Sequence, residues 1–469
     1  MTPTPPRPRL LIALWAAKAA AFLSARLRGG GATALPGLLA ERIDPAFVAT
    51  LAGRLEGGAV LITGTNGKTT TARLLAEMLA AGGHATVHNR EGSNLTRGIA
   101  SALAAASDWR GRPRDSGALA LMETDEATLP AAVRALRPRA VAFTNLFRDQ
   151  LDRYGEVDTV AARWRESLAL LPPTATLVLN ADDPSVAELA LDWSGPVHWY
   201  SLAAARGASS SPGPADARWC RACGAAYRYE TRYAAHLGRW SCSGCDRTSP
   251  EADTAALAIE SAPDGLGLIV PGLGDLELPL GGLYNAGNAL AAIALARALD
   301  LPEAAIRDGL AAARPAFGRG ELVALGDSRL RLLLCKNPAG ASEALRLVED
   351  EPGPAEVAFV LNDRYADGRD VSWIWDVDFE RLAGRVERCW AGGVRAEDAA
   401  LRLRYAGWPE PLAADPRPAP FLEALAQRSG DRPVTVLLTY TALLDLRAEL
   451  ARRSVFSESS GTRIRTATS

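Results

Sequence analysis

The sequence predicts an α/β protein with two sheet-containing domains, the first of them interrupted by a small cysteine-rich insert. Short apolar runs alternate with longer amphipathic segments over residues 53–200 and again after residue 315, and two CxxC pairs stand between residues 219 and 246. Alternation of this kind is typical of βαβ units around a mostly parallel sheet. The chain has 469 residues, which is room for about two to four domains of roughly 100–200 residues each.

Composition and charge exclude several classes of protein. Hydrophobic residues make up 48% and charged residues 23% of the chain, a globular balance that excludes wholesale disorder. The 52 Lys and Arg residues against 54 Asp and Glu residues give a net charge of −2, so a generic nucleic-acid binder, which needs an excess of cations, is not expected. Six cysteines in so long a chain are too few for a disulfide scaffold.

Residues 1–52 are predicted to form a helical lead-in, with loops at residues 29–31 and at Leu35-Pro36-Gly37. The apolar run Leu10–Leu27 has the length of a signal sequence, but Lys18 stands in its middle, which a signal core or a membrane-spanning helix avoids. The larger residues of this run recur at the spacing of an amphipathic helix: Leu10, Leu11, Leu14, Trp15 and Phe22. We therefore expect a helix of a cytoplasmic protein, with contact at the inner face of the membrane left open.

The first domain is placed at residues 53–315, with strands expected at Ala59–Thr63, Leu119–Met122, Val141–Thr144 and Thr176–Leu179 and an Ala-rich helix at Asn285–Leu299. Small residues and prolines at 204–218 predict a flexible boundary before the insert, which we place at about 217–248. The second domain is placed at residues 316–452, with strands expected at Leu330–Leu334, Val357–Leu361 and Val434–Leu438. Residues 453–469 are expected to be a disordered tail.

A phosphate-binding loop is the strongest motif of the chain. Gly64-Thr65-Asn66-Gly67-Lys68-Thr69-Thr70 follows the first strand directly and precedes a helix predicted at Thr71–Ala81. Glycines let backbone N–H groups approach an anion at a helix N-terminus, the lysine reaches the outer phosphates, and the hydroxyls suit Mg²⁺. Ile62 stands where the general pattern has its first glycine, so the loop is a shortened variant. Nucleotide binding is favoured over a plain glycine turn, and Lys68 is expected to be a loop charge whose removal leaves the fold intact.

A carboxylate at the end of a neighbouring strand fits the same chemistry. Glu123 follows Leu119–Met122, with Asp125 and Glu126 behind it. Acids at strand ends face the phosphate site of a doubly wound sheet, and carboxylate oxygens are ligands for Mg²⁺. The alternative to Mg²⁺ binding is that Glu123 is only a solvated charge in a loop.

These motifs occur in the order seen in Mur ligases, which the chain resembles. The order continues through Thr144–Glu156, Leu179–Pro184, Leu283–Asn288 and Gly318–Glu321. Mur ligases join an amine to a carboxylate through an acyl phosphate made from ATP. In the second of those segments, the resemblance places Asp182 near the ribose of the nucleotide.

The same resemblance implies roles for further residues. The phosphate loop would bind ATP, with Lys68 and Thr69 on the phosphates and Mg²⁺, and Glu123 would hold Mg²⁺. Asn288 would face the adenine and Arg319 the phosphates. Gln150 stands where many peptide-adding relatives have a histidine, which counts against a metal-binding histidine at that position.

Two CxxC pairs predict a structural zinc site. Cys220 and Cys223 form the first pair, and Cys242 and Cys245 form the second. Two such turns close a tetrahedral Zn²⁺ site, and four thiolates leave no open position for catalysis. A redox pair and a [4Fe–4S] cluster are the less favoured alternatives.

Other residues of the insert and the two remaining cysteines have structural roles in this interpretation. Trp219, Tyr227 and Trp240 are expected to pack a fold too small for its own core. His236 is expected on the surface, and Cys335 and Cys389 are expected to be buried thiols.

Ordinary Mur ligases lack such a ribbon, which narrows the resemblance to the MurT family, the ligase-like subunits of lipid II isoglutaminyl synthases. Leu361–Asp376 (LNDRYADGRDVSWIWD) is similar to the most characteristic segment of that family, and Asn89–Asn94 to its loop after the second strand. The implied fold is a Mur ligase-like central P-loop ATPase domain with a zinc-ribbon insert, followed by a C-terminal Rossmann-like α/β domain. The family carries a functional aspartate in that second domain, for which Asp370 is our match and Asp367 the reserve.

The resemblance implies ATP-dependent amidation of the α-carboxylate of D-glutamate in the stem peptide of lipid II, with ammonia from a GatD-type glutaminase in a heterodimer. The chain itself indicates that the glutaminase is a separate subunit. All four histidines precede residue 237, so neither Cys335 nor Cys389 has a histidine downstream for a glutamine-hydrolysing pair. The alternatives are an amino-acid-adding ligase of the Mur or folylpolyglutamate type and a non-catalytic scaffold that senses nucleotide.

Overall fold

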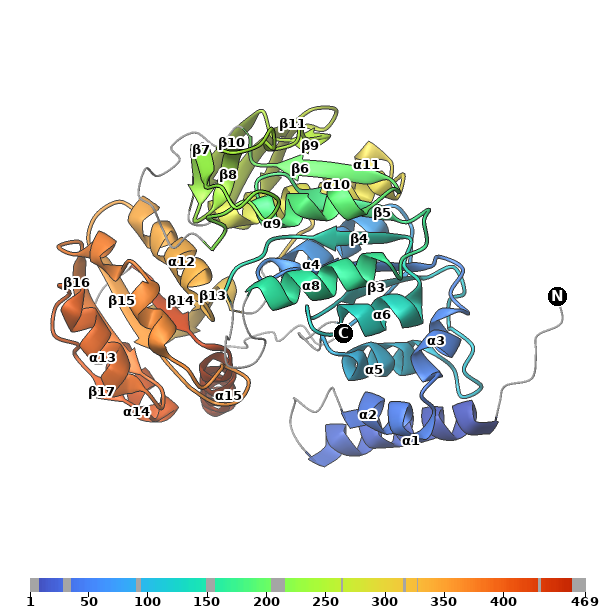
Figure 1. Ribbon diagram of the computed structural model, residues 1–469. Coiled ribbons are helices and arrows are strands. Elements are labelled where there is room, and N and C mark those ends of the chain that lie inside the picture. Colours follow the sequence, from blue (N-terminus) through green and yellow to red (C-terminus); the bar gives the residue numbers. More distant parts are fainter. Residues whose placement is uncertain are drawn as a thin grey trace.

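The computed structural model describes residues 8–27, 35–89, 94–148, 157–203, 216–262, 265–314, 318–326, 328–428 and 432–457. Figure 1 shows blue N-terminal helices at one edge, a central α/β domain that carries the green insert at its top, and an orange C-terminal α/β domain on the other side.

A seven-stranded parallel sheet forms the centre of the molecule, in the order β2-β3-β1-β4-β5-β6-β9. Its strands are β1 (Ala59–Thr63), β2 (Thr86–His88), β3 (Leu119–Glu123), β4 (Ala140–Phe143), β5 (Thr176–Asn180), β6 (Val197–Ser201) and β9 (Thr254–Ala255). β1, β3 and β4 are buried along their whole length, as expected for a parallel sheet covered on both faces. The strand order reverses beside β1, which is where α/β proteins bind their ligands.

Helices cover both faces of this sheet (Figure 1). They are α4 (Lys68–Ala81), α5 (Thr96–Ala106), α6 (Leu129–Leu136), α8 (Val157–Leu168), α9 (Pro184–Ala187), the 3-10 helix η1 (Glu188–Asp192), α10 (Leu283–Ala298) and α11 (Glu303–Ala311). Alternate residues of β1 point to opposite cores: Val60 and Ile62 pack with α4 and α10, whereas Leu61 packs with α5, α6 and α8. The central domain is this sheet with its helices.

Three helices, α1 (Pro8–Leu27), α2 (Leu35–Ile43) and α3 (Phe47–Ala52), pack beside α5. The loop expected at Leu35-Pro36-Gly37 is wrong, because these residues open α2 and a proline is tolerated in a first helical turn. Gly37 allows close packing on α5, since a Cβ there would lie 1.7 Å from the carbonyl oxygen of Arg97. Among the described residues, no helix has both the length and the apolar character that crossing a bilayer requires.

Two small antiparallel sheets belong to the same half of the molecule. The insert holds the hairpin β7 (Tyr227–Ala234) and β8 (Leu237–Cys242), and a three-stranded sheet is formed by β10 (Ala258–Ala262), β11 (Gly265–Val270) and β12 (Gly274–Leu278). Leu266, Leu268 and Leu276 of the three-stranded sheet join the core around α10.

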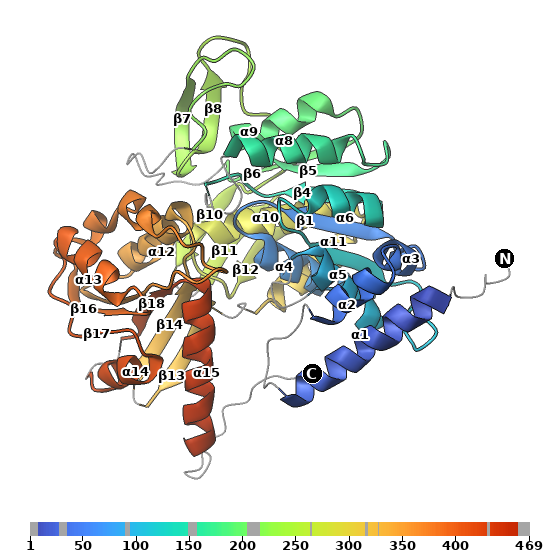
Figure 2. The same ribbon diagram turned by 60° about the horizontal axis from the view of Figure 1, so that its bottom comes forward.

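The C-terminal domain has a six-stranded sheet in the order β13-β14-β18-β15-β16-β17, parallel except for β13 against β14. Its strands are β13 (Arg319–Leu325), β14 (Ser328–Leu334), β15 (Ala355–Val360), β16 (Val386–Gly392), β17 (Ala414–Asp415) and β18 (Val434–Leu438). Its helices are α12 (Pro338–Asp350), η2 (Ser372–Asp376), η3 (Phe379–Leu382), α13 (Ala396–Tyr405), α14 (Pro418–Ala426) and α15 (Tyr440–Ser457). Figure 2 shows α15 as a long helix at the near edge of this domain.

The end of α15 corrects one expectation. Residues 453–457 were expected in a disordered tail, but the helix continues through them to Ser457. Residues 458–469 lie outside the described residues.

Candidate active site

The phosphate loop joins β1 to α4 and uses its glycines for conformation and close packing. Gly64 has φ 127° and Gly67 has φ 88°, a region that residues with a Cβ rarely adopt. A Cβ on Gly67 would also lie 2.1 Å from Oδ1 of Asn288. The turn therefore leads directly into the N-terminus of α4 at Lys68, where unpaired backbone N–H groups favour an anion.

The segment after β4 holds the loop in place. The backbone N–H of Thr65 donates to the carbonyl of Asn145 at 2.9 Å, and that of Asn66 donates to Oδ1 of the same residue at 2.8 Å. The hydroxyl of Thr144 donates to the carbonyl of Asn66 at 2.7 Å, and the N–H of Phe147 donates to the Thr65 hydroxyl at 2.9 Å. These contacts explain why the Thr144–Phe147 part of the motif accompanies the phosphate loop.

Lys68 is buried and paired, which corrects the expectation of a loop charge. Its ammonium donates to the carbonyl of Gly64 and to Oε1 of Glu126, the latter at 2.8 Å, and both residues are less than a tenth exposed. Burial alone lowers the pKa of Lys68, but the carboxylates of Glu126 and Glu123 outweigh it and the net direction is upward. Burial raises the pKa of the Glu126 carboxyl.

Glu126 is a site residue to which the sequence alone assigned no role. Its only signal was a third acid close behind Glu123.

Thr69, Glu123 and Arg319 meet at the end of β3. The Thr69 hydroxyl lies 2.8 and 3.0 Å from the two oxygens of Glu123, and Arg319 donates to that hydroxyl at 3.3 Å. Asn89 fixes the strand end, because its amide donates to the Glu123 carbonyl and accepts from the Glu123 N–H, both at 2.8 Å. A hydroxyl and a carboxylate are oxygen donors of the type that Mg²⁺ prefers, and a guanidinium suits phosphate. The structure thus brings together three of the predicted residues from both domains.

A cavity of about 1090 Å³, part of it open to solvent, lies beside the loop between the central and C-terminal domains. Asn66, Gly67, Asn288 and Arg319 line it, as does Tyr284. Asn288 is further fixed by its amide, which donates to Oδ1 of Asn285 at 3.1 Å. A concave site of this size accommodates a nucleotide-sized ligand.

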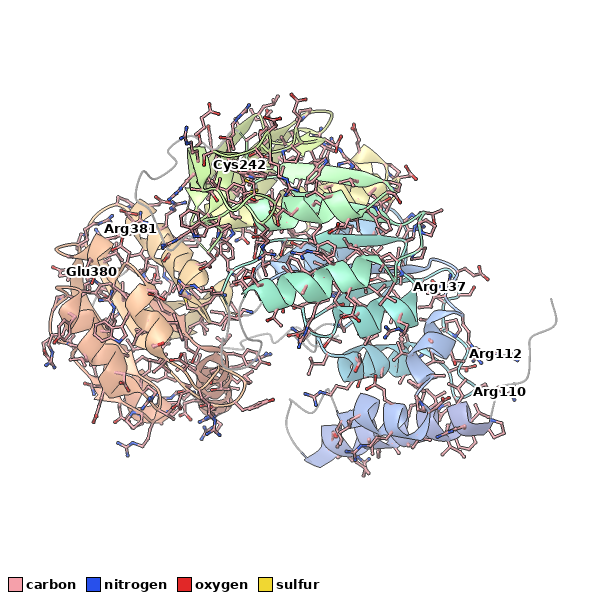
Figure 3. All side chains as sticks on the ribbon, in the orientation of Figure 1. Arg110, Arg112, Arg137, Cys242, Glu380 and Arg381 are labelled. Carbon is pink, nitrogen blue, oxygen red and sulfur yellow. The ribbon has the colours of Figure 1, made fainter. Side chains whose placement is uncertain are left out.

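Several residues that sequence reasoning missed line the same cavity. Ala234, Ala235 and Leu237 come from the tip of the insert hairpin, and Arg346 and Arg381 come from the C-terminal domain. In Figure 3, Arg381 lies on the side of the C-terminal domain nearer to the insert, which carries the labelled Cys242. No motif marks these residues, because they meet only through tertiary packing.

Asn337 ties the C-terminal domain to the phosphate loop. Its amide donates to Oδ1 of Asn66 at 3.1 Å, and the Asn66 amide donates back to Oδ1 of Asn337 at 3.3 Å. The same Oδ1 of Asn337 accepts from the N–H of Gly340 at 2.8 Å and caps α12. The two domains therefore share a reciprocal amide pair at the site.

Asp182 does not line the large cavity but lines a smaller one beside it. Its oxygens accept from the Ser201 hydroxyl and the Leu202 N–H, both at 2.7 Å, and burial raises its pKa to about 7. It lines a smaller cavity of about 420 Å³, which shares Tyr284 and Asn288 with the larger one. Its role near a ribose stays a prediction.

The four predicted cysteines come together. The sulfur atoms of Cys220, Cys223, Cys242 and Cys245 all lie within 4.8 Å of one another. Gly224 has φ 72° in the first turn, a conformation that glycine adopts freely. Four converging thiols fit a tetrahedral Zn²⁺ site.

The expected packing of the insert is correct for two of three aromatic residues. Trp240 is buried, stacks edge-on against Tyr227 at 5.1 Å, and donates to the carbonyl of Ala181 at 3.1 Å. Trp219 is 64% exposed and does not pack the insert. Cys335 and Cys389 are buried, as expected.

His236 is fully buried, so the expectation of a surface residue is wrong. Its Nε2 lies 3.3 Å from Oδ2 of Asp183, and its ring lies 4.6 Å from that of Phe147. The hairpin folds back onto the central domain, where the N–H of Gly238 donates to the carbonyl of Asp182 at 2.9 Å. This docking places the hairpin tip in the wall of the large cavity.

The two candidate aspartates of the C-terminal domain have different surroundings. Asp370 is exposed, and its carboxylate accepts from the N–H of Ser372 at 2.8 Å. Hydrogen bonding by the Ser372 hydroxyl, and secondly by this N–H, lowers the pKa of Asp370. Asp367 is buried and accepts from the N–H and the hydroxyl of Thr441, while burial raises its pKa. Neither lines the cavity at the phosphate loop.

Two predicted segments lie outside the described residues. They are residues 149–156, with Gln150, and residues 90–93 of the loop after the second strand.

Comparison with known proteins identifies relatives along the chain. A family model described as "MurT ligase C-terminal" matches residues 334–443, and one described as "Mur ligase middle domain" matches residues 62–211. The chain is 33% identical over 447 residues to the "Lipid II isoglutaminyl synthase (glutamine-hydrolyzing) subunit MurT" of Streptococcus pneumoniae, covering 95% of this chain and 97% of that protein. The protein of the same name from Staphylococcus aureus is 32% identical, with 92% and 95% covered.

The fold has solved counterparts as well. The pseudomurein peptide ligase type C from Methanothermus fervidus matches with a TM-score of 0.64 at 20% identity, covering 86% of this chain and 80% of that one. This likeness supports the Mur ligase fold. Together with the full-length sequence relatives, it confirms the predicted fold class and family: the chain belongs to the MurT family of Mur ligase-like proteins.

Proposed function

We propose that the chain is the synthase subunit of a lipid II isoglutaminyl synthase. It uses ATP to amidate the α-carboxylate of D-glutamate in the lipid II stem peptide to D-isoglutamine. The observation that carries the proposal is the meeting of Lys68, Thr69, Glu123 and Arg319 at the switch point of the central sheet. The chain also aligns with relatives of that name over nearly their whole length.

Each group at this site has a role in the proposed reaction. The N-terminus of α4 and the guanidinium of Arg319 hold the phosphates, and Lys68 neutralises charge on the transferred phosphoryl group. Thr69 and Glu123 hold Mg²⁺, which when bound neutralises the phosphate oxygens. Phosphoryl transfer to the carboxylate oxygen leaves ADP, and attack of ammonia on the carbonyl carbon then releases phosphate and a proton and forms the amide.

Ammonia is supplied in this proposal by a GatD-type glutaminase in a heterodimer. Burial raises the pKa of the Cys335 thiol to about 12 and that of Cys389 to about 11, values unsuited to a nucleophilic thiolate. On the surface of the C-terminal domain, Trp375 is 50% exposed and Tyr405 is 70% exposed, with their rings 5.5 Å apart. Exposed aromatic pairs are typical of protein interfaces, and Asp370 lies in the same segment as Trp375. We place the heterodimer in the cytoplasm.

Amidation of lipid II with and without the glutaminase tests the proposal. With ATP and glutamine, we expect product only when both subunits are present, and with ammonium chloride we expect product from this chain alone. An amino-acid-adding ligase would instead extend its substrate when offered free amino acids. A nucleotide-sensing scaffold would bind ATP without turnover, and either result would contradict the proposal.

We further propose one structural Zn²⁺ per chain, held by Cys220, Cys223, Cys242 and Cys245. Protein purified without chelator is expected to contain about one zinc per chain by elemental analysis. Replacing Cys245 with Ser should lower this content and the melting temperature, because the insert depends on the metal for its fold. Cys389→Ser, outside the quartet, should leave the zinc content unchanged. Iron, or no metal, in the purified protein would contradict the zinc site.

A further inference from the structure

The outward face of α1 is apolar. The helix buries Leu10, Ala13, Leu14, Ala17 and Ala20. The large apolar residues expected to form one amphipathic face are therefore divided, because Trp15 and Phe22 point away from the protein. Ile12 is 54% exposed, Trp15 49%, Phe22 57% and Leu23 55%. Ile12 and Trp15 are three residues apart and Trp15 and Phe22 are seven apart, and at 3.6 residues per turn all four side chains fall on one helix face. A helix of a water-soluble protein normally presents charged side chains there.

A second exposed tryptophan extends this face. Trp109, in the loop after α5, is 64% exposed, and its carbonyl accepts from Nε1 of Trp15 at 2.9 Å. The ammonium of Lys18 donates to the carbonyls of Ala104 and Ser107 and lies 5.5 Å from the ring centre of Trp109. The loop and α1 are therefore fixed to one another, and we call Ile12, Trp15, Phe22, Leu23 and Trp109 the α1 patch.

The charges around the α1 patch have one dominant sign. Within α1 the charged residues are Arg9, Lys18 and Arg26, and the helix has no Asp or Glu. Exposed Arg110 and Arg112 follow Trp109, and Figure 3 places both on the outer edge of the molecule beside α1 and α3. The side chain of Asp108 is occupied locally, because it accepts from the N–H groups of Arg110 and Arg112 at 2.8 Å.

From this pairing of an apolar face with cations, we infer that α1 docks on an anionic lipid surface. Helices that lie in a membrane interface combine Trp, Phe and Leu with Lys and Arg, and their binding adds buried apolar area to attraction by anionic headgroups. α1 is not apolar enough to span the bilayer, so we infer that it lies along the membrane surface. The charge around the α1 patch favours lipid over a second copy, because two such patches would repel each other.

The inference rests on the proposed function for its purpose, since a lipid-linked substrate is bound at a membrane. Helix α5 connects the α1 patch with the strand end next to the phosphate loop. Its N-terminal side begins near Asn94, whose carbonyl accepts from the N–H of Asp125 behind Glu123 at 2.9 Å, and its C-terminal end reaches Lys18. The 11 residues of α5 span about 17 Å. Both ribbon views show α1 at the edge away from the C-terminal domain (Figures 1 and 2).

Flotation with vesicles tests the inference without any lipid II. The full chain is expected to float with vesicles of equal parts phosphatidylglycerol and phosphatidylcholine, and less with phosphatidylcholine alone. Phe22→Ser/Leu23→Ser should lower the partition coefficient by roughly tenfold or more. The matched control, Leu191→Ser/Leu257→Ser, removes two side chains that are 59% and 67% exposed elsewhere and should bind as the wild type does.

Several results would overturn the inference. The wild type could remain unbound to the anionic vesicles, or both variants could bind equally well. A lipid-free dimer in sedimentation velocity that is lost in Phe22→Ser/Leu23→Ser would assign the α1 patch to a second copy instead. Amidation of detergent-dissolved lipid II separates the two proposals. Phe22→Ser/Leu23→Ser should leave this activity unchanged. If the wild type fails to amidate, the proposed function is contradicted, whereas vesicle binding is unaffected.

Discussion

Lys68→Ala is expected to lower ATP-dependent amidation by roughly a thousandfold or more, because it removes the only ammonium that we place on the transferred phosphoryl group. The structure adds an effect on stability that the sequence did not indicate. Lys68 pairs with Glu126 inside the protein, and removal of one partner of a buried pair costs about 3–5 kcal/mol. Protonation of Glu126, whose pKa burial already raises, reduces this cost. Turnover and calorimetric titration with ATP and Mg²⁺ measure the first effect, and thermal unfolding measures the second.

A double variant separates catalysis from stability. In Lys68→Ala/Glu126→Gln neither charge of the pair remains, so the melting temperature should recover most of the loss, while amidation stays as low as in Lys68→Ala. Unchanged ATP affinity and turnover in Lys68→Ala would contradict the role of the lysine. A double variant as unstable as the single one would contradict the importance of the ion pair.

Asp370→Asn is expected to lower glutamine-dependent amidation by roughly a hundredfold, the scale seen when a charge that orients a catalytic group is neutralised. Asp370 is exposed and distant in sequence from the phosphate loop, so we expect it to act on the partner glutaminase or on ammonia delivery. An asparagine can still accept from the N–H of Ser372, so ATP binding and co-purification with the glutaminase should be unchanged. Ammonium chloride should restore amidation in the variant.

Two further variants are informative beside it. Asp398→Asn changes a carboxylate of α13 in the same domain whose side chain is 44% exposed and should have no effect. Asp367→Asn changes a buried side chain that accepts from Thr441, so it should lower stability. Wild-type rates with glutamine in Asp370→Asn would show that Asp370 has no role and would direct attention to Asp367, and failure of ammonium to restore activity would place Asp370 at the acyl-phosphate step.

Features that depend on the local sequence, such as strands and the cysteine quartet, could mostly be predicted. The strands Ala59–Thr63 and Val434–Leu438 have the predicted bounds, because short apolar runs between turns are recognisable in any sequence. The cysteine quartet could likewise be recognised, because two CxxC pairs are the spacing of a four-thiolate metal site, and the four sulfur atoms do converge.

The contacts that could not be predicted join residues far apart in the chain. Asn66 and Asn337 are separated by 271 positions, and nothing in either neighbourhood indicates the other. His236 was misplaced because the docking of a hairpin depends on the surface that receives it. In α1, residues on nearly every side are apolar, so periodicity identified a helix but could not decide which face is buried.

The reciprocal amide pair between the two domains has a consequence for the catalytic cycle. Two neutral hydrogen bonds, each worth about 1 kcal/mol net because water replaces them on opening, favour contact over separation by only about thirtyfold. The amide pair therefore does not by itself lock the C-terminal domain onto the phosphate loop. Because Asn66 stands inside the loop, a ligand that moves the loop also disturbs this contact, and we expect ligand occupancy and domain closure to be coupled.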